Sequence, residues 1–270
     1  MTTVVVCDLD GVLYLHDRPV PRARQALESL EAAGVRLVFA TNNSTKTPER
    51  VVSDLHRRVG FRADPAMVAT AAMATAAFVA PSAPRPYVLG ADGLVVSLRR
   101  EGIDAVATAA MADTVIVGLD PNLTYRRLAD AVLAIGAGAA FVATGTDPTY
   151  PTPEGLYPGT GAIVAAVGVA TGVDPVVCGK PHPPMIALVR RLVGDADVVW
   201  VVGDRPETDL AMARAAGWAG ILVLTGVTAD ASEVPADLRP EVVVPSIAEV
   251  PAVVLGGGAA DPASPPSPHR

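Results

Sequence analysis

The first strand-like segment of the chain ends in two acidic residues. The apolar run 4–7 is rich in β-branched side chains and is followed by Asp8, Asp10 and Gly11. Such a run predicts a strand buried on both faces, as in a parallel sheet. Alternate side chains of an extended chain point to the same side, so Asp8 and Asp10 are expected to lie together. Two neighbouring carboxylates repel each other unless a cation or a shared proton compensates, and a strand end with solvated acids is the alternative.

Further apolar runs alternate with segments of helical periodicity along most of the chain. This alternation predicts an α/β fold, with a doubly wound parallel sheet and a second, inserted α/β layer structure. The expected strands are 35–40, 87–89, 114–118, 140–143, 176–178, 198–202, 221–224 and 241–244. The expected helices are 22–33, 47–60, an alanine-rich helix within 65–84, 93–100, 125–135, 161–171, 184–193 and one that ends at 217.

The composition is typical of a globular chain and argues against several partners. With 270 residues, of which 50% are hydrophobic, the chain can bury a sizeable core and form two domains. Its net charge of −7 argues against nucleic acid as a partner. The uncharged stretch 65–84 consists mostly of alanine, threonine and proline, so we expect a packed helix there and no membrane span.

The two ends of the chain and its two cysteines bear on its location. The N-terminus passes straight into the first strand without the pattern of a secretory signal. Cys7 and Cys178 both lie in apolar strand contexts, which predicts buried free thiols and a cytoplasmic protein. Residues 256–270 are rich in glycine, alanine, proline and serine and are expected to be a disordered tail.

Polar groups follow four of the predicted strands. They are Asp8 and Asp10, then Thr41, Asn42 and Asn43, then Lys180, and finally Asp204 and Asp209. In a parallel sheet these groups meet at one edge, where ligands of α/β proteins bind. Each group has an ordinary explanation, as turn residues, a solvated lysine or acids at a helix N-terminus. Together, acids, a lysine and a hydroxyl suit a divalent cation and a phosphate.

These motifs resemble those of the haloacid-dehalogenase superfamily. DLDGV carries Asp8 and Asp10, TNNS carries Thr41, and GKP carries Lys180, while GDRPETD carries the last two acids. The motifs occur in the expected order and cover residues 1 to about 255. The long insertion between the second and third motifs resembles class IIA caps, as in 4-nitrophenyl phosphatases, phosphoglycolate phosphatases and NagD-like phosphatases. The resemblance implies a core domain of residues 1–46 and 179–255, a cap of residues 47–178 and a tail of residues 256–270.

The chemistry of these residues and the resemblance imply the same roles. A hard cation such as Mg²⁺ shields an attacking carboxylate from an anionic phosphate ester. Asp8 is then expected to attack phosphorus and form an aspartyl-phosphate, and Asp10 to act as general acid and base. The expected metal ligands are Asp8, Asp10 through its backbone carbonyl, Asp204 and Asp209. The expected phosphate-binding groups are Thr41, Asn42, Asn43 and Lys180.

The cap segment Gly145–Thr146–Asp147 departs from the subfamily pattern. Relatives usually have Ala-Thr-Asn-x-Asp there, whereas this chain has Gly145 in place of the asparagine. Because the core groups recognise only phosphoryl oxygens and the metal, we expect this loop to bind the leaving group and select the substrate. An ordinary turn far from the site is the alternative.

The expected activity is that of a cytoplasmic, Mg²⁺-dependent phosphatase of small phosphorylated metabolites. Glycerol phosphate, phosphoglycolate, sugar phosphates and nucleoside monophosphates are all candidate substrates. A dehalogenase is disfavoured by Asp10, because a halide leaving group needs no proton. A non-catalytic module that binds a phosphorylated metabolite is the alternative from another class. Caps of this subfamily commonly take part in dimer contacts, so the resemblance allows a homodimer.

Overall fold

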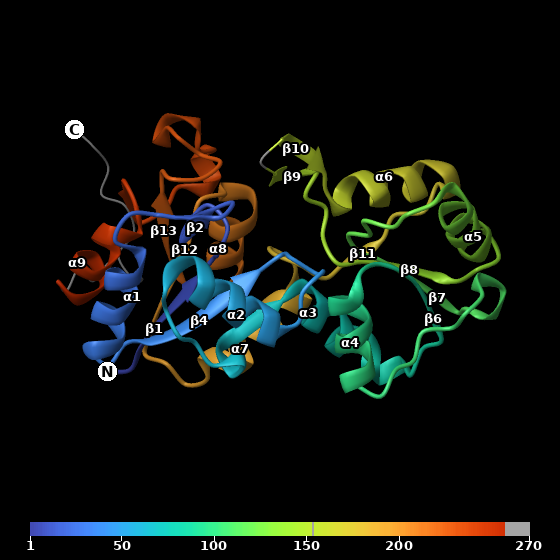
Figure 1. Ribbon diagram of the computed structural model, residues 1–270, viewed down its shortest axis with the longest axis horizontal. Coiled ribbons are helices and arrows are strands. Elements are labelled where there is room, and N and C mark those ends of the chain that lie inside the picture. Colours follow the sequence, from blue (N-terminus) through green and yellow to red (C-terminus); the bar gives the residue numbers. More distant parts are fainter. Residues whose placement is uncertain (153, 257–270) are drawn as a thin grey trace.

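The computed structural model describes residues 1–152 and 154–256. In it the chain forms two α/β bodies that lie side by side (Figure 1). The first body is built around a six-stranded sheet, and the second around a four-stranded sheet. The α/β fold predicted from the sequence is confirmed.

The strands of the larger sheet are all parallel and follow the order β14-β13-β12-β1-β4-β5. They are β1 (Thr3–Cys7), β4 (Arg36–Thr41), β5 (Val68–Thr70), β12 (Val198–Gly203), β13 (Ala219–Val223) and β14 (Val242–Val244). The chain winds from β1 to β5 on one side and later from β12 to β14 on the other. The sheet is therefore doubly wound, and its winding reverses between β1 and β12, where such sheets bind ligands.

The central strand β1 supplies side chains to two cores, one on each face of the sheet. Val5 and Cys7 belong to one apolar cluster, and Val4 and Val6 belong to the other. The first face is covered by α1 (Ala23–Ala32), α2 (Pro48–Val59) and α9 (Val250–Leu255), and the second by α3 (Ala71–Val79), α7 (Pro183–Val193) and α8 (Ala211–Ala216). This alternation explains why the run reads as continuously apolar: both faces are buried.

The smaller sheet is also parallel, in the order β11-β8-β7-β6. Its strands are β6 (Pro86–Leu89), β7 (Thr114–Val117), β8 (Ala140–Ala143) and β11 (Val176–Val177), and its helices are α4 (Asp92–Arg100), α5 (Tyr125–Gly136) and α6 (Thr160–Thr171). Helices α5 and α6 pack on one face of this sheet, while α4 and α3 pack on the other.

The alanine-rich helix α3 is shared by the two bodies. Ala71 and Ala74 contribute to a core of the larger sheet, whereas Ala72, Ala76 and Val79 contribute to a core of the smaller one. Small side chains on all sides let a helix approach two neighbours closely, which accounts for the uncharged composition of this stretch. The predicted packed helix is confirmed. Within the described residues no helix is long and apolar enough to cross a membrane.

The chain changes from one sheet to the other later than the cap boundary expected from the sequence. The cap was expected to begin at residue 47, but α2 packs on the larger sheet and β5 pairs with β4 inside it. The chain passes to the smaller sheet only between β5 and β6, through the shared helix α3. The sequence does not show this change of sheet, because β5 is a three-residue strand whose apolar pattern merges with the alanine-rich helix that follows. The predicted tail 256–270 lies, apart from residue 256, outside the described residues.

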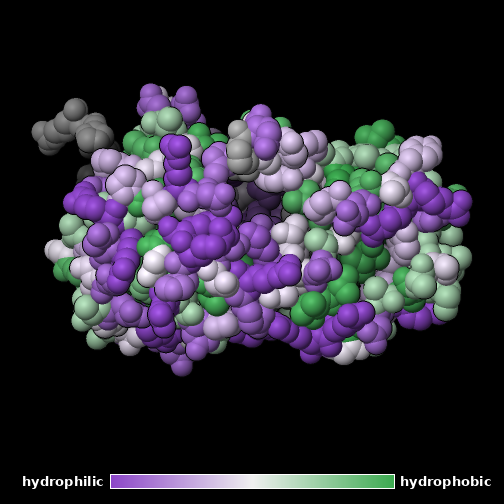
Figure 2. Space-filling view, in the orientation of Figure 1, coloured by the Kyte–Doolittle hydropathy of each residue, from purple (hydrophilic) through white to green (hydrophobic). Residues whose placement is uncertain are grey.

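Two antiparallel hairpins were not expected from the sequence. One joins β2 (Tyr14–Leu15) to β3 (Arg18–Pro19), close to the two first aspartates. The other joins β9 (Thr149–Thr152) to β10 (Gly155–Pro158) and rises above the junction of the two bodies (Figure 1). The surface between the bodies is hollowed beside this second hairpin, and hydrophilic residues border the hollow (Figure 2).

Substitution of Gly93 tests the contact between α4 and the loop after β4. A Cβ on Gly93 would lie 2.5 Å from the backbone nitrogen of Lys46, so Gly93→Ala must push the two bodies apart. We expect a loss of about 1–3 kcal/mol in the free energy of unfolding, measured by urea denaturation. Gly136→Ala in α5 is the matched control, because its Cβ meets open space and alanine favours the helix. Equal losses in both variants would contradict the close contact.

Candidate active site at the carboxyl edge of the six-stranded sheet

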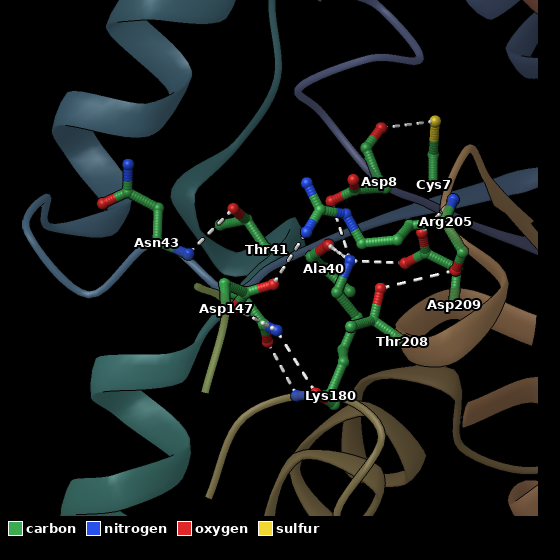
Figure 3. A network of polar contacts seen from close by, with 11 residues as sticks. Cys7, Asp8, Ala40, Thr41, Asn43, Asp147, Lys180, Arg205, Thr208 and Asp209 are labelled. Atoms are coloured by element: carbon green, nitrogen blue, oxygen red, sulfur yellow. Dashed lines mark hydrogen bonds and ion pairs between the residues drawn. The ribbon is translucent and has the colours of Figure 1, made fainter. Parts of the chain in front are cut away.

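The predicted site residues gather where the winding of the larger sheet reverses. Asp8 follows β1, Thr41 ends β4, and Asp204 follows β12, so the three lie at the carboxyl ends of neighbouring strands. Lys180 arrives from the loop that returns from the second body, and Asp209 lies in the single π-helical turn Pro206–Leu210 (Figure 3). The sequence therefore identified correctly which segments meet at this edge.

The buried ammonium of Lys180 connects these segments. Its Nζ donates to Asp8 Oδ1 at 2.8 Å, to Asp209 Oδ1 at 2.6 Å and to the carbonyl oxygen of Ala40 at 3.0 Å (Figure 3). The side chain is only 3% exposed. Burial works against its charged form, but Asp209 and Asp8 outweigh this effect and hold the pKa of Lys180 above its ordinary value. The lysine thus stays charged at every physiological pH.

Three carboxylates lie close together at this edge, and the single positive charge of Lys180 does not balance them. Asp8, Asp204 and Asp209 each offer an oxygen atom, and these atoms all lie within 4.8 Å of one another. Burial raises the pKa of Asp8 well above its ordinary value, with Lys180 opposing and Asp209 adding to the rise. Burial and the charge of Asp209 also raise the pKa of Asp204, to about 6. Hard oxygen donors with an excess of negative charge suit a divalent cation such as Mg²⁺.

Backbone packed around Asp204 fixes the position of its carboxylate. Its Oδ2 accepts a hydrogen bond from Val227 N at 2.6 Å, and a Cβ on either Gly11 or Gly226 would overlap that oxygen. Gly11 also has a φ of +88°, a conformation that favours glycine. Thr225 Oγ1 donates to Gly11 O at 2.6 Å and so joins the two loops. The loop after β13 was not expected at this site from the sequence, although its glycine follows a predicted strand at the same edge.

Thr41 and Asn43 organise the loop after β4. Thr41 is buried, and its Oγ1 accepts a hydrogen bond from Asn43 N at 3.1 Å. The Oδ1 of Asn43 accepts from Thr45 N at 2.8 Å and from Thr45 Oγ1 at 2.7 Å. The Asn43 side chain is therefore engaged in an Asx turn that shapes the loop, as the ordinary explanation of this residue expected.

Asn42 joins the loop after β4 to Lys180 and to the second body. Its Oδ1 accepts from Lys180 N at 2.7 Å, and its Nδ2 donates to Lys180 O at 3.2 Å. The same Nδ2 donates to Asp147 Oδ2 at 3.0 Å. Arg205, which the sequence analysis did not single out, places its Nη1 at 3.5 Å from Asp147 Oδ1 (Figure 3). Asp147 thus lies against the core residues of the site and is not part of a distant turn.

The backbone of the 145–147 segment packs against the start of α6. A Cβ on Gly161 would overlap Thr146 O, and one on Gly159 would overlap Asp147 O. Gly145 is buried, and its Cβ position lies 3.3 Å from Asp147 Oδ2. The packing explains why glycines frame this segment: only backbone fits between the loop and the helix.

Asp10 lies apart from the three clustered carboxylates. It forms a β-bridge with Tyr14 of the first hairpin, and its side chain is exposed. The surrounding protein nevertheless raises the pKa of Asp10 by desolvation, an effect that Lys46 and Arg58 oppose. A carboxyl whose pKa is raised keeps its proton more readily than an ordinary carboxyl, which suits a general acid.

Comparison with known proteins agrees with this geometry. Residues 5–104 match the family described as Haloacid dehalogenase-like hydrolase, and residues 177–250 match a second description of HAD-like hydrolases. The acid sugar phosphatase of Staphylococcus aureus is 38% identical over 224 residues, which are 82% of this chain and 86% of that protein. The chain is therefore a hydrolase of the haloacid-dehalogenase superfamily.

Two solved structures narrow the class further. The glycerol phosphate phosphatase of Mycobacterium tuberculosis in complex with magnesium has a TM-score of 0.84 at 35% identity, over 90% of this chain and 75% of that one. The 4-nitrophenylphosphatase of Thermotoga maritima has a TM-score of 0.85 at 31% identity, over 94% and 97%. Within the superfamily, the chain belongs to the class IIA phosphatases, the NagD-like and 4-nitrophenylphosphatase group.

The raised pKa of Asp204 predicts how the free energy of unfolding depends on pH when a chelator keeps the protein free of metal. The folded chain binds this proton more tightly than the unfolded chain, whose carboxyl has its ordinary pKa of 3.8. The resulting stabilisation is complete below the unfolded pKa and is lost as the pH rises through about 6. Asp204→Asn has no such proton. Between about pH 5 and about pH 7, its free energy of unfolding should therefore rise by about 1 kcal/mol relative to that of the parent. Denaturant unfolding at both pH values measures this difference, and parallel pH profiles would contradict it.

Proposed function

We propose that this chain is a Mg²⁺-dependent phosphatase of small phosphorylated metabolites that works through an aspartyl-phosphate on Asp8. The observation that carries the proposal is the buried Lys180 ammonium held between Asp8 and Asp209, with Asp204 beside them. This arrangement brings a carboxyl nucleophile, a cation for phosphoryl oxygens and oxygen ligands for a metal into one place. It lies in a chain whose relatives are phosphatases.

The residues present fit a magnesium ion. The carboxylates of Asp8, Asp204 and Asp209 and the backbone carbonyl of Asp10 would hold it, and the excess of acids over Lys180 would balance its charge. When bound, Mg²⁺ shields the negative charge of the phosphate and orients it toward Asp8.

Asp8 and Asp10 divide the covalent chemistry between them. An Asp8 carboxylate oxygen attacks phosphorus, and the bond from phosphorus to the ester oxygen breaks. Asp10 gives its proton to the departing alkoxide, so its raised pKa is useful at this step. Asp10 then takes a proton from a water molecule, which attacks the aspartyl-phosphate and releases inorganic phosphate. The free carboxylate of Asp8 and the protonated Asp10 are restored.

The transferring phosphoryl group needs donors on its other oxygens. The Thr41 hydroxyl, the amides near Asn42 and Asn43 and the Lys180 ammonium are the groups we assign to this role. Lys180 is rigidly placed, because Asn42 bonds to both its backbone nitrogen and its backbone oxygen. Donors that are fixed before the reaction need no reorganisation during it, which favours the charged transition state.

The segment Gly145–Asp147 is our candidate for the part of the cap that selects the substrate. The support is that Asp147 contacts Asn42 and Arg205, beside the proposed phosphoryl site. Glycerol phosphate, phosphoglycolate, sugar phosphates and nucleoside monophosphates are the candidate substrates. The names of the relatives support the glycerol phosphate and sugar phosphate members of this set.

A non-catalytic module that binds a phosphorylated metabolite is the competing function. It keeps the same fold and anion-binding groups but needs neither an ionised nucleophile nor a proton donor. A screen of phosphorylated metabolites at equal concentration, with Mg²⁺ and with a chelator, distinguishes the two. Release of phosphate that requires Mg²⁺ supports the phosphatase, whereas binding without turnover supports the module.

We also propose a cytoplasmic location and, with the subfamily, a core and a cap that act as separate units. Cys7 and Cys178 are buried and unpaired, as predicted, which suits a reducing compartment. The homodimer that the resemblance allows stays a prediction, and sedimentation velocity would test it.

Substitution of Asp8 and Asp10 tests the division of chemistry. Asp8→Asn should abolish phosphoenzyme formation, because a carboxamide is not a nucleophile. Asp10→Asn should slow turnover of alkyl phosphates by about 10²–10⁴-fold and of esters with good leaving groups much less. Acid quench of enzyme with labelled substrate measures the phosphoenzyme. Accumulation of a phosphoenzyme in Asp8→Asn would show that another residue is the nucleophile.

Substitution of the cap segment tests substrate selection. Gly145→Asn and Asp147→Ala should reorder the preferred substrates, because both alter the segment to which we assign substrate selection. Hydrolysis of 4-nitrophenyl phosphate, which needs little recognition, should change much less. The measurement is kcat/KM over a panel of phosphate esters for each variant. If both variants change every rate by the same factor, the segment does not select the substrate.

A further inference from the structure

The loop after β13, residues 224–228, packs closely against Asp204. Val227 N donates to Asp204 Oδ2 at 2.6 Å, and Thr228 N donates to Asp204 O at 3.3 Å. A Cβ on Gly226 would overlap the same Oδ2, so only a glycine backbone fits at that place. The loop therefore holds both the side chain and the backbone of Asp204.

The same loop also holds the segment that carries Asp8 and Asp10. Thr225 Oγ1 donates to Gly11 O at 2.6 Å, across 214 positions of the sequence. Gly11 N donates to Tyr14 O at 2.9 Å, so the peptide groups on both sides of Gly11 are engaged. In a planar trans peptide the N–H and the C=O point in opposite directions, so a fixed Gly11 N–H also fixes the carbonyl of Asp10.

We propose that Thr225 is a positioning residue for the divalent metal site. Its hydroxyl joins the loop that presents the Asp10 carbonyl to the loop that holds the Asp204 carboxylate. Two of the proposed ligands thereby keep their relative position, although Thr225 is not itself a ligand. The inference rests on the proposed Mg²⁺-dependent function.

The proposed ligands fall into two groups that are held by different residues. Lys180 donates to Asp8 Oδ1 and to Asp209 Oδ1, and so fixes the first group from the second body. The Asp10 carbonyl and the Asp204 carboxylate form the second group, and they depend on the contact between their two loops. Within that contact, Thr225 supplies a side-chain hydrogen bond from one loop to the other.

The position of the ligands matters more for Mg²⁺ than for Ca²⁺. Mg²⁺ requires near-octahedral geometry with ligand distances of about 2.0–2.1 Å, whereas Ca²⁺ accepts irregular sites with distances of about 2.3–2.6 Å. Removal of a group that orients metal ligands typically costs about 10–100-fold in metal affinity. Loss of the Thr225 hydroxyl should therefore weaken the binding of Mg²⁺ more than that of Ca²⁺.

The test measures metal binding to the whole chain in the absence of substrate. Isothermal titration calorimetry of the chelator-treated and dialysed protein, with MgCl₂ and separately with CaCl₂, gives the two dissociation constants. Thr225→Val and Thr225→Ala both remove the hydroxyl, and the first keeps the volume of the side chain. We expect each to raise the Kd for Mg²⁺ by about tenfold and the Kd for Ca²⁺ by less than about threefold.

Two further variants are the controls. Thr225→Ser keeps the hydroxyl, so it should bind Mg²⁺ within about twofold of the parent. Thr171→Val removes a hydroxyl of the same kind far from the site, since Thr171 Oγ1 donates to Val167 O at 2.9 Å in α6. It should leave both dissociation constants unchanged. Cooperative thermal unfolding in a chelator shows that each variant is folded.

The outcomes separate the role of Thr225 from the proposed function. If Thr225→Val and Thr225→Ala bind Mg²⁺ as tightly as the parent, or if Thr225→Ser is as weak as they are, the positioning role is overturned while the metal site stands. An equal loss of affinity for both metals would also overturn it, because the hydroxyl would then not set the geometry of the site. If the parent binds neither metal, the proposed metal-dependent function fails, and this inference fails with it.

Discussion

The buried contact of Lys180 with Asp8 and Asp209 is the interaction on which the rest of the site depends. Lys180 reaches Asp8 across 172 positions of the sequence, and almost the whole inserted body lies between them. Removal of one partner from a buried ion pair typically costs about 3–5 kcal/mol, because an uncompensated charge is left behind. The lysine therefore does two things: it allows acidic residues to be buried together, and it forces the insertion to return to the edge of the sheet from which it departs.

A short row of polar contacts holds the insertion to the core. Asn42 and Ser44 contact the loop after β8, and Thr45 contacts the start of α4, while α3 contributes to the cores of both sheets. Apolar packing of α3 holds the two bodies together, and the polar contacts fix the relative position of the carboxyl edges of the two sheets. As a result, the groups that we propose to bind phosphate lie opposite the loop of the second body that we propose to contact the leaving group.

The sequence predicted those features that depend on local pattern. Strand β1 and Asp8 were recognisable because an apolar run on both faces of a sheet must end where polar groups begin. Strand β5 was not recognisable, since three residues next to an alanine-rich helix are too few to show the periodicity of a strand. The partners of Asp147 and the role of Arg205 also escaped prediction, because they depend on how two distant loops pack. The close packing of Gly11 and Gly226 against the Asp204 carboxylate was not predicted either, because it arises only when the two loops meet in the folded chain.

Asn42 illustrates why a residue type alone did not settle its role. As an asparagine after a strand it is typical of a turn, and by resemblance it is part of a phosphate loop. The structure adds a third role, in which one side chain holds the backbone of Lys180 and the cap residue Asp147 at once. The segment proposed to select substrates and the lysine proposed to bind the phosphoryl group are therefore mechanically connected. A leaving group that displaces Asp147 must act on Asn42 and, through it, on the position of Lys180. With the roles that we propose for Asp147 and Lys180, a single amide then links specificity to catalysis.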